Sequence, residues 1–309
     1  MLLESRQFKA MGTCITLSIL DQHASSLLNI AENKIKYWEK RFSANDNNSE
    51  LMTVNRNAGL APVRVQSDLF DLIQFALNVT IASSLKMNIL IGPLVKLWKI
   101  GFDGAHLPPS DQIKSRLNLI HPNDVILNPQ NNEVYLTRPG MEIDLGAIAK
   151  GYFADQLQQL FIQHGVVSGV INLGGNVMTI GRPSYEQEYW HIGIRNPFES
   201  TDKPLLILKV KNKSVVTSGI YERFFEHENV IYHHILDSQT GYPANNDIAS
   251  VTIVSNHSID GEIWSTICSF GTAQQNINIL SQVDGIEGLI ITRQRQILYT
   301  PHLKNKIIF

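Results

Sequence analysis

The sequence predicts an α+β fold in a single domain spanning residues 1–309. Segments with strand periodicity come in runs, and helical segments cluster between these runs instead of alternating with single strands. Apolar residues make up 43% of the 309 residues, which is enough to form a sizeable core. This length would also accommodate two domains, but no Pro- or Ser-rich linker divides the chain, so we expect one.

The first part of the chain predicts one strand, two helices and a loop. Apolar and polar residues alternate over Thr13–Leu20, as in a half-buried strand. Apolar residues recur every three or four positions over Ser25–Phe42, which predicts an amphipathic helix. The polar, Asn-rich stretch Ala44–Ser49 predicts a loop, and Asp68–Ser84 predicts a second helix.

The middle of the chain predicts a short helix, a hairpin and a helix–strand pair. Ser110 is a candidate N-cap for the short helix. Asp124–Leu127 and Glu133–Thr137 flank an Asn-Pro-Gln-Asn-Asn turn, which predicts a hairpin. Ala147–His164 predicts a helix that ends at a glycine, and Val166–Leu173 predicts a buried strand.

The last third predicts strands followed by helices and a closing hairpin. Several short strands are expected over Trp190–Val254. Asp260–Phe270 and Ala273–Val283 have helical periodicity, and Gly288–Thr292 with Gln296–Thr300 predicts the hairpin.

Composition excludes several classes of protein. The 26 Lys and Arg nearly balance the 28 Asp and Glu, whereas dedicated nucleic-acid binders are usually basic, so we expect no nucleic acid. Two cysteines, Cys14 and Cys268, cannot build a disulfide scaffold or a zinc ribbon. The sequence contains no stretch of 18 consecutive apolar residues, so no membrane span is predicted. The first residues do not form a signal peptide, so we expect a cytoplasmic protein, or a periplasmic one if a leader was removed.

Two glycine-containing segments have features of ligand-binding turns. Asp144–Gly151 places an acid before small residues and a helix start, where the backbone can approach an anionic ligand. The same pattern is typical of an ordinary strand–helix turn with Asp144 as N-cap. Gly174-Gly175 follows a predicted strand and permits close backbone contact, but a plain turn has the same sequence.

Two pairs of side chains could take part in catalysis. His233 and His234 are adjacent in a predicted strand and therefore point to opposite faces, so only one can face a given pocket, as a general base or as a structural residue. Glu262 and Thr266 lie four residues apart on a predicted helix and share a face. Their oxygens suit Mg²⁺, but a solvated acid beside a half-buried threonine would have the same spacing.

The order of these segments resembles the ApbE family of FAD:protein FMN transferases, from about Phe8 to Gly271. The matching blocks, in chain order, are Met11-Gly12-Thr13; Phe42-Ser43 with Ser49-Glu50-Leu51 and Asn55; Gly92-Pro93-Leu94-Val95 with Leu97-Trp98; Asp144–Gly151 with Tyr152 and Asp155; Asn172-Leu173-Gly174-Gly175; Thr217-Ser218-Gly219 with Tyr221-Glu222-Arg223; and His234-Ile235-Leu236-Asp237 with Thr240-Gly241. Several blocks in the same order are far more specific than any one of them.

The resemblance implies an enzyme that binds FAD and Mg²⁺. It implies transfer of FMN from FAD to a threonine hydroxyl of an acceptor flavoprotein, with release of AMP. It also implies a largely antiparallel sheet flanked by helices in a single ApbE-like domain related to the T-fold.

Site residues follow from the same resemblance, position by position. Flavin contacts are implied for Met11, Asn45, Lys86, Met87, Asn88, Asp144, Lys150 and Ile235, metal contacts for the backbone carbonyl of Ala147 and the side chains of Glu262 and Thr266, and a general-base role for His234. Lys150 could pair with a phosphate or with an acid, and Met11 suits a soft apolar wall against a ring.

This chain departs from the family pattern at several of these positions. The family usually has Asp where this chain has Asn88, Asn176, Ile220 and Glu262. Asn45 replaces a usual aromatic residue and would remove a stacking surface for the flavin or adenine ring. Because Mg²⁺ requires near-octahedral geometry, the longer Glu262 could shift the metal site, and Asp260 is an alternative ligand if the helix register differs.

The departures leave two alternatives to an active transferase. One is a flavin-binding protein that no longer transfers FMN, or that hydrolyses FAD to FMN and AMP. The other is a scaffold that binds no flavin.

Overall fold

The computed structural model describes residues 3–199, 201 and 203–309, which form two compact units. The first unit takes in residues 1–37, 149–219 and 246–309, and the second takes in residues 38–148 and 220–245. Neither unit is a continuous stretch of sequence, because the chain passes repeatedly from one to the other, and the expectation of one domain stays a prediction. Residues 1 and 2, at the start of the segment considered as a signal peptide, lie outside the described part.

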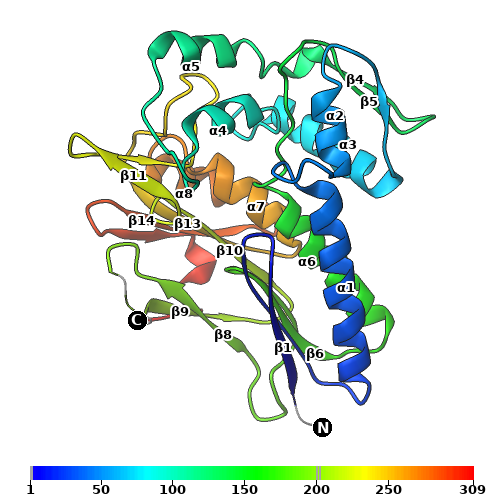
Figure 1. The fold of residues 1–309 in the computed structure, drawn as a ribbon. Helices are drawn as coiled ribbons and strands as arrows, with labels where there is room; N and C mark the ends of the chain where they lie inside the picture. Colours follow the sequence, from blue (N-terminus) through cyan, green and yellow to red (C-terminus); the bar gives the residue numbers. More distant parts are fainter. Residues whose placement is uncertain (1–2, 200, 202) are drawn as a thin grey trace. The chain divides into compact units, whose positions relative to one another are not determined.

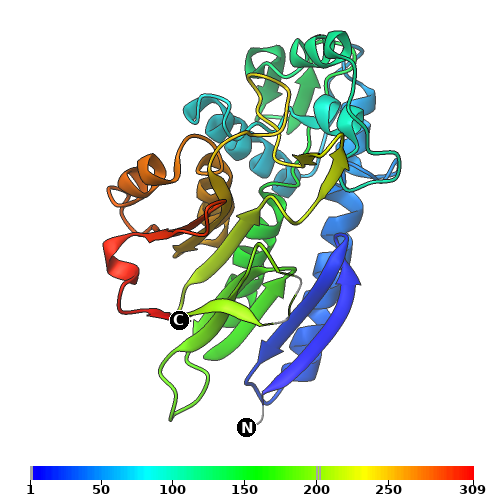
Figure 2. The ribbon, with the colours of Figure 1, turned by 90° about the vertical axis from the view of Figure 1, so that its left-hand side faces the viewer.

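An eight-stranded antiparallel sheet forms the centre of the first unit. In spatial order its strands are β1 (Glu4–Ala10), β2 (Thr13–Ile19), β6 (Ser168–Leu173), β7 (Asn176–Gly181), β10 (Ser214–Gly219), β13 (Ile248–Ser255), β14 (Glu287–Thr292) and β15 (Ile297–Tyr299) (Figure 1). Every neighbouring pair is antiparallel, which confirms the α+β class with a largely antiparallel sheet. The β1–β2 hairpin, blue in Figure 2, ends the sheet on one side.

Helices and a smaller sheet complete the first unit. The helices are α6 (Ala149–Gln163), α7 (Ser258–Ile267), α8 (Ala273–Leu280), the 3₁₀ turn η2 (Pro301–Leu303) and the beginning of α1 (Ala24–Phe42); the smaller sheet contains β8 (Trp190–Arg195), β9 (Pro204–Val210) and β16 (Ile307–Ile308). In the part of the chain that the structure describes, no helix is long and apolar enough to cross a membrane.

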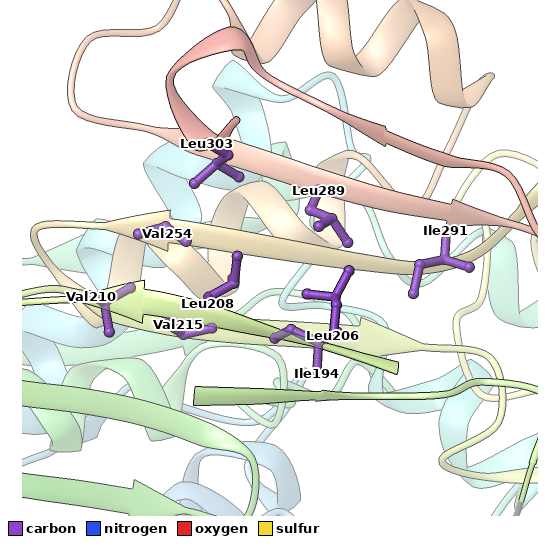
Figure 3. Packing of buried hydrophobic residues seen from close by; sticks show 9 residues of the cluster. All are labelled: Ile194, Leu206, Leu208, Val210, Val215, Val254, Leu289, Ile291 and Leu303. Carbon is purple, nitrogen blue, oxygen red and sulfur yellow. The ribbon is translucent and has the colours of Figure 1, made fainter. Parts of the chain in front are cut away.

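Alternating side chains of the large sheet contact these two layers. Val215 and Val254 face the smaller sheet and pack with Leu206 and Leu208 (Figure 3). The next residue of β10, Val216, approaches α7, and the residue before Val254 in β13 packs against α8. All eight residues of β13 are therefore buried, because both faces of this strand are covered.

Two tight turns lie side by side at one end of the large sheet. Met11-Gly12 joins β1 to β2 and Gly174-Gly175 joins β6 to β7, and all four residues have positive φ, as type I′ turns require. A Cβ on Gly174 would lie 2.2 Å from Thr13 Oγ1, so only glycine allows the two turns to approach this closely. Two of the sequence blocks thus meet in the structure.

The second unit is built from short helices and two small antiparallel sheets. Its elements are the last turn of α1, α2 (Glu50–Arg56), α3 (Ser67–Ala82), α4 (Gly92–Trp98), α5 (Ser110–Leu117), the 3₁₀ turn η1 (Pro122–Asp124), a sheet of β3 (Val63–Arg64), β5 (Glu133–Leu136) and β4 (Val125–Asn128), and the hairpin β11 (Phe224–His227)–β12 (Val230–His233). Arg41 of α1, which is buried, donates hydrogen bonds to Glu50 of α2 and Asp68 of α3 and so joins three helices.

Trp98, the last residue of α4, connects the loop that contains Gly241 and Tyr242 to the β11–β12 hairpin. Its indole Nε1 donates to the carbonyl of Gly241 at 2.8 Å. Its ring lies 5.6 Å from the rings of both Tyr232 and Tyr242, and Tyr232 in turn stacks on Phe225 at 5.3 Å. The fully buried tryptophan therefore has both its apolar surface and its N–H satisfied.

Most predicted elements are present, and their ends differ from the predicted ones by at most three residues. The prediction that Ser110 caps α5 is wrong: Ser110 is the first helical residue, Pro109 occupies the cap position, and no side chain caps this helix. Several elements were not predicted from the sequence, namely β1, β3, β7, β16, α2 and α4. β1 is a mostly exposed edge strand with little apolar alternation, and the two helices have seven residues each, too few for a clear period.

The start of α7 is capped by a side chain from α6. No side chain of its own caps this helix, but the buried carboxylate of Asp155 accepts from the backbone N–H of Ser258 at 2.6 Å and of Ile259 at 2.9 Å. A Cβ on Gly151, one turn earlier in α6, would lie 2.7 Å from the carbonyl oxygen of Ser258. Glycine is therefore required for the two helices to be close enough for the cap to form.

Burial raises the pKa of Asp155 to about 6, although the N–H groups of Ile259 and Ser258 and the charge of His257 oppose this. Between the unfolded pKa near ~4 and the folded value, the folded state binds more protons, so the free energy of unfolding falls as pH rises. Above the folded pKa this loss is complete and amounts to at most ~3 kcal/mol.

The variant Asp155→Asn should therefore lack a part of the pH dependence of stability. It keeps one oxygen acceptor for the α7 N–H groups but cannot titrate. We expect the stability of the unsubstituted protein, relative to the variant, to decrease from about pH 4 to about pH 6 and to stay level above that. Urea unfolding of both proteins across this range measures it, and parallel curves would contradict the assignment.

Candidate functional site

In the first unit, the candidate site centres on the carboxylate of Glu262. This side chain lies in the middle of α7 and is only 4% exposed, so the alternative of a solvated acid is wrong. Its Oε1 accepts a hydrogen bond from Asn176 Nδ2 at 2.8 Å and lies 3.9 Å from Lys150 Nζ. A buried carboxylate needs such partners, because taking a charge out of water is unfavourable.

Asn176 belongs to a chain of buried polar groups. It is the first residue of β7, directly after the Gly174-Gly175 turn, and is 2% exposed. Its Oδ1 accepts from Ser258 Oγ at 2.7 Å, and Ser214 Oγ donates to Ser258 Oγ at 3.0 Å. The chain of hydrogen bonds therefore runs from β10 through the first turn of α7 to Glu262.

Lys150 and Thr266 flank Glu262 on the two helices. Lys150 is the second residue of α6 and pairs with an acid, one of the two partners expected for it. Thr266 is half-buried and lies one helical turn after Glu262, so the two oxygens share a face of α7. Asp260, the alternative metal ligand, lies about 200° around the helix axis from Glu262 and so occupies another face.

In the second unit, Asp144 lies in the irregular segment 137–148, which follows β5 in the sequence. The expectation that it ends a strand and caps the helix is wrong, because α6 begins only at Ala149 and residues 141–145 form no strand. Its carboxylate instead accepts from the N–H of Gly146 at 2.7 Å, and its own N–H donates to Ile89 O at 2.7 Å. Burial raises the pKa of Asp144, while this hydrogen bond, Arg223 and Lys96 act in the opposite direction.

The small residues that follow Asp144 have different surroundings. Gly146 and Ala147 are exposed, so their backbone is open to a ligand. Gly151 is buried, and its missing side chain makes room for α7 rather than for a ligand.

The two adjacent histidines differ in burial, but the expectation that both lie in a strand is wrong for His234, because β12 ends at His233. His233, the last residue of β12, is 2% exposed, and its Nε2 lies 2.9 Å from the carbonyl of Ala244. His234 follows the strand and is half-exposed; its Nδ1 lies 3.3 Å from the carbonyl of Arg223. A carbonyl can only accept, so this hydrogen bond places a proton on Nδ1 and leaves Nε2 as the basic nitrogen.

The remaining expected flavin contacts have three kinds of surroundings. Asn45 lies exposed in the 43–48 loop, as predicted, and Lys86 is exposed after α3. Met87 and Asn88 are buried, and the amide of Asn88 donates to Ile120 O at 3.0 Å and accepts from Leu90 N at 2.9 Å. Ile235 and Met11 are half-buried, and Met11 has positive φ in its turn.

The structure thus brings together Glu262, Lys150 and Thr266 within the first unit, and places Asp144 and His234 within the second. Among the described residues, no three His, Cys, Asp or Glu side chains gather into a metal site. No sequence pattern assigned roles to Ser214, Ser258 or Arg223. Asn176 is one of four positions that depart from the family's usual Asp, and only the structure shows that it contacts Glu262.

Known protein sequences match this chain over most of its length. The ApbE family matches residues 11–290. A Klebsiella pneumoniae (strain 342) protein described as FAD:protein FMN transferase is 40% identical over 288 residues, covering 93% of this chain and 89% of that protein. A Treponema pallidum (strain Nichols) protein with the same description is 35% identical over 309 residues, covering 95% and 85%.

Solved structures share the fold. The ApbE protein of Thermotoga maritima superposes with a TM-score of 0.90 at 26% identity and covers 99% of both chains. The flavin transferase ApbE of Vibrio cholerae gives a TM-score of 0.83 at 20% identity, which supports the fold alone. Because the sequence match spans nearly all of the chain and two relatives exceed 30% identity, this chain belongs to the ApbE family.

Proposed function

We propose that this chain is an FAD:protein FMN transferase that uses Mg²⁺ and transfers FMN to a threonine hydroxyl of an acceptor flavoprotein, releasing AMP. The observation that carries the proposal is the buried, hydrogen-bonded carboxylate of Glu262, on the same helix face as Thr266, in a chain 40% identical to a protein of this description. A buried carboxylate with a fixed hydrogen-bond partner is held in one orientation, as a metal ligand needs to be.

The residues proposed to hold Mg²⁺ fit its chemistry. The Glu262 carboxylate, the Thr266 hydroxyl and the Ala147 carbonyl are all hard oxygen donors, the kind that Mg²⁺ prefers. When bound, the ion would neutralise charge on the pyrophosphate as AMP leaves. Lys150 adds a positive charge beside Glu262.

The residues proposed to bind the flavin have different surroundings. Asn45 and Lys86 have exposed polar side chains for a ligand, and Met11 offers a soft apolar surface. Asp144 and Lys150 supply charged groups, and Ile235 lies next to the proposed base. We propose that the buried Met87 and Asn88 also contact the flavin.

His234 is proposed to accept the proton of the acceptor hydroxyl. The threonine oxygen attacks the phosphorus of the FMN phosphate, and the bond from that phosphorus to the bridging oxygen breaks, so that AMP leaves with this oxygen. The hydroxyl proton moves to Nε2 of His234, which the Nδ1 contact with Arg223 leaves basic. Because threonine is a weak nucleophile at neutral pH, a positioned base is required.

The proposal is tested by AMP release from FAD at several Mg²⁺ concentrations, with and without an acceptor domain that carries a candidate threonine. We expect release that depends on Mg²⁺ and increases with acceptor, together with covalent flavin on the acceptor. Release without acceptor labelling would indicate an FAD pyrophosphatase. Tight FAD binding without release would indicate a flavin-binding protein that has lost transfer.

The variant His234→Ala should lose transfer but keep FAD. We expect the transfer rate to fall by about 10²–10⁴-fold, the usual contribution of a general base. The Kd for FAD should be essentially unchanged, as measured by fluorescence titration. The exposed His227, on the same hairpin, provides the matched control: His227→Ala should change neither quantity. Equal loss of binding and transfer in His234→Ala would contradict the assignment.

The variant Glu262→Gln should weaken the response to Mg²⁺. Glutamine keeps the length of the side chain and can still accept from Asn176, but it has no charge for the metal. We expect the Mg²⁺ concentration for half-maximal activity to rise at least about tenfold. Asp260→Asn is the control and should leave this concentration unchanged. The opposite result would identify Asp260 as the ligand.

A further inference from the structure

We propose that Asn176 is a positioning residue, which holds the carboxylate of Glu262 in the orientation that binds the divalent cation. The inference rests on the proposed role of Glu262 as a metal ligand. Its structural basis is the 2.8 Å hydrogen bond from Asn176 Nδ2 to Glu262 Oε1, between two side chains that are 2% and 4% exposed. Both side chains lie in the first unit of the fold.

The surrounding hydrogen bonds fix which way the Asn176 amide points. Ser214 donates to Ser258, Ser258 donates to Asn176 Oδ1, and Asn176 donates to Glu262. If the amide were reversed, its oxygen would face the carboxylate and both groups would repel each other. The series of hydrogen bonds thus runs in one direction, and its last donor is the Asn176 N–H group that faces Glu262.

Glutamate needs such support more than aspartate does. It has one more rotatable bond, and Mg²⁺ tolerates little deviation from octahedral geometry. Hydrogen bonds to a ligating carboxylate orient it, and their loss typically lowers metal affinity by about 10–100-fold. Lys150 at 3.9 Å contributes charge but is too distant to fix the orientation by a hydrogen bond.

The two departures from the family pattern are therefore two halves of one interaction. Asparagine at position 176 can donate to a carboxylate, whereas the usual aspartate, when ionised, can only accept. Glutamate at position 262 places its oxygen within hydrogen-bonding distance of that amide. Where the family pattern has two carboxylates, this chain has a donor at position 176 and an acceptor at position 262.

The first test measures metal binding rather than turnover. Mg²⁺ is titrated by calorimetry into the FAD-saturated protein without acceptor, for the unsubstituted chain, Asn176→Ala and the control Asn276→Ala. Asn276 is equally buried, at 2%, and donates to the carbonyls of Cys268 and Phe270. We expect Mg²⁺ affinity to fall about 10–100-fold in Asn176→Ala and to stay unchanged in Asn276→Ala.

Thermal unfolding without Mg²⁺ separates positioning from loss of fold, because both asparagine variants lose buried hydrogen bonds but only one contacts Glu262. Unchanged Mg²⁺ affinity in Asn176→Ala, with a clear loss in Glu262→Gln, would overturn the positioning role and leave the ligand assignment intact. No Mg²⁺ binding by the unsubstituted protein would overturn both.

A double-mutant cycle tests whether Ser258 acts through Asn176. Ser258→Ala should lower Mg²⁺ affinity less than Asn176→Ala does, because Asn176 can still donate. The double variant should bind Mg²⁺ no more weakly than Asn176→Ala alone. If the two fold-losses in Mg²⁺ affinity multiply in the double variant, Ser258 and Asn176 act independently. The proposal that Ser258 acts through Asn176 would then be wrong.

Discussion

The close approach of α6 and α7 is the constraint on which the first unit's candidate site depends. Gly151 removes the side chain that would otherwise meet the Ser258 carbonyl, and Asp155 then reaches the N–H groups at the start of α7. This cap fixes α7 along its axis relative to α6. Since Lys150 lies in the first turn of α6 and Glu262 in the second turn of α7, the same contact determines the distance between the two charges. The contact between α6 and α7 therefore both stabilises the fold and positions Lys150 beside Glu262.

In the second unit, irregular segments are held by side chains from distant parts of the sequence. Asn55 of α2 pairs with both the N–H and the carbonyl of Ile143, directly before Asp144. Trp98 of α4 holds the Gly241 carbonyl in the loop that follows His234. Such segments cannot satisfy their own backbone groups, so buried amide and indole groups do it for them. Several sequence blocks that seem to be separate motifs are thus donor and acceptor partners of each other.

Three acidic residues of the fold have different electrostatic surroundings. Glu262 has an amide and an ammonium group close to its carboxylate, whereas burial dominates the environment of Asp144 and raises its pKa despite Arg223 and Lys96. Burial also disfavours the anionic form of Asp155, whose carboxylate accepts two backbone N–H bonds at the start of α7. Acidic residues of one family signature therefore have separate tasks: Asp155 is structural, and Asp144 stands in the proposed flavin segment.

The sequence was sufficient to predict the fold class, the long helices, two of the hairpins and the family, because periodicity and turn residues are local and the motif order is specific. The shared helix face of Glu262 and Thr266 was predictable as well, since it follows from the residue period of a helix. The strand geometry expected for the two histidines failed at His234, which lies beyond the end of β12. Tertiary contacts, in contrast, bury Glu262, supply Asn176 and Lys150 as its partners, let Asp155 cap α7 and leave Asp144 without a helix to cap. These facts depend on contacts between residues up to about a hundred positions apart, such as Asp155 with Ile259, and no local pattern encodes such contacts.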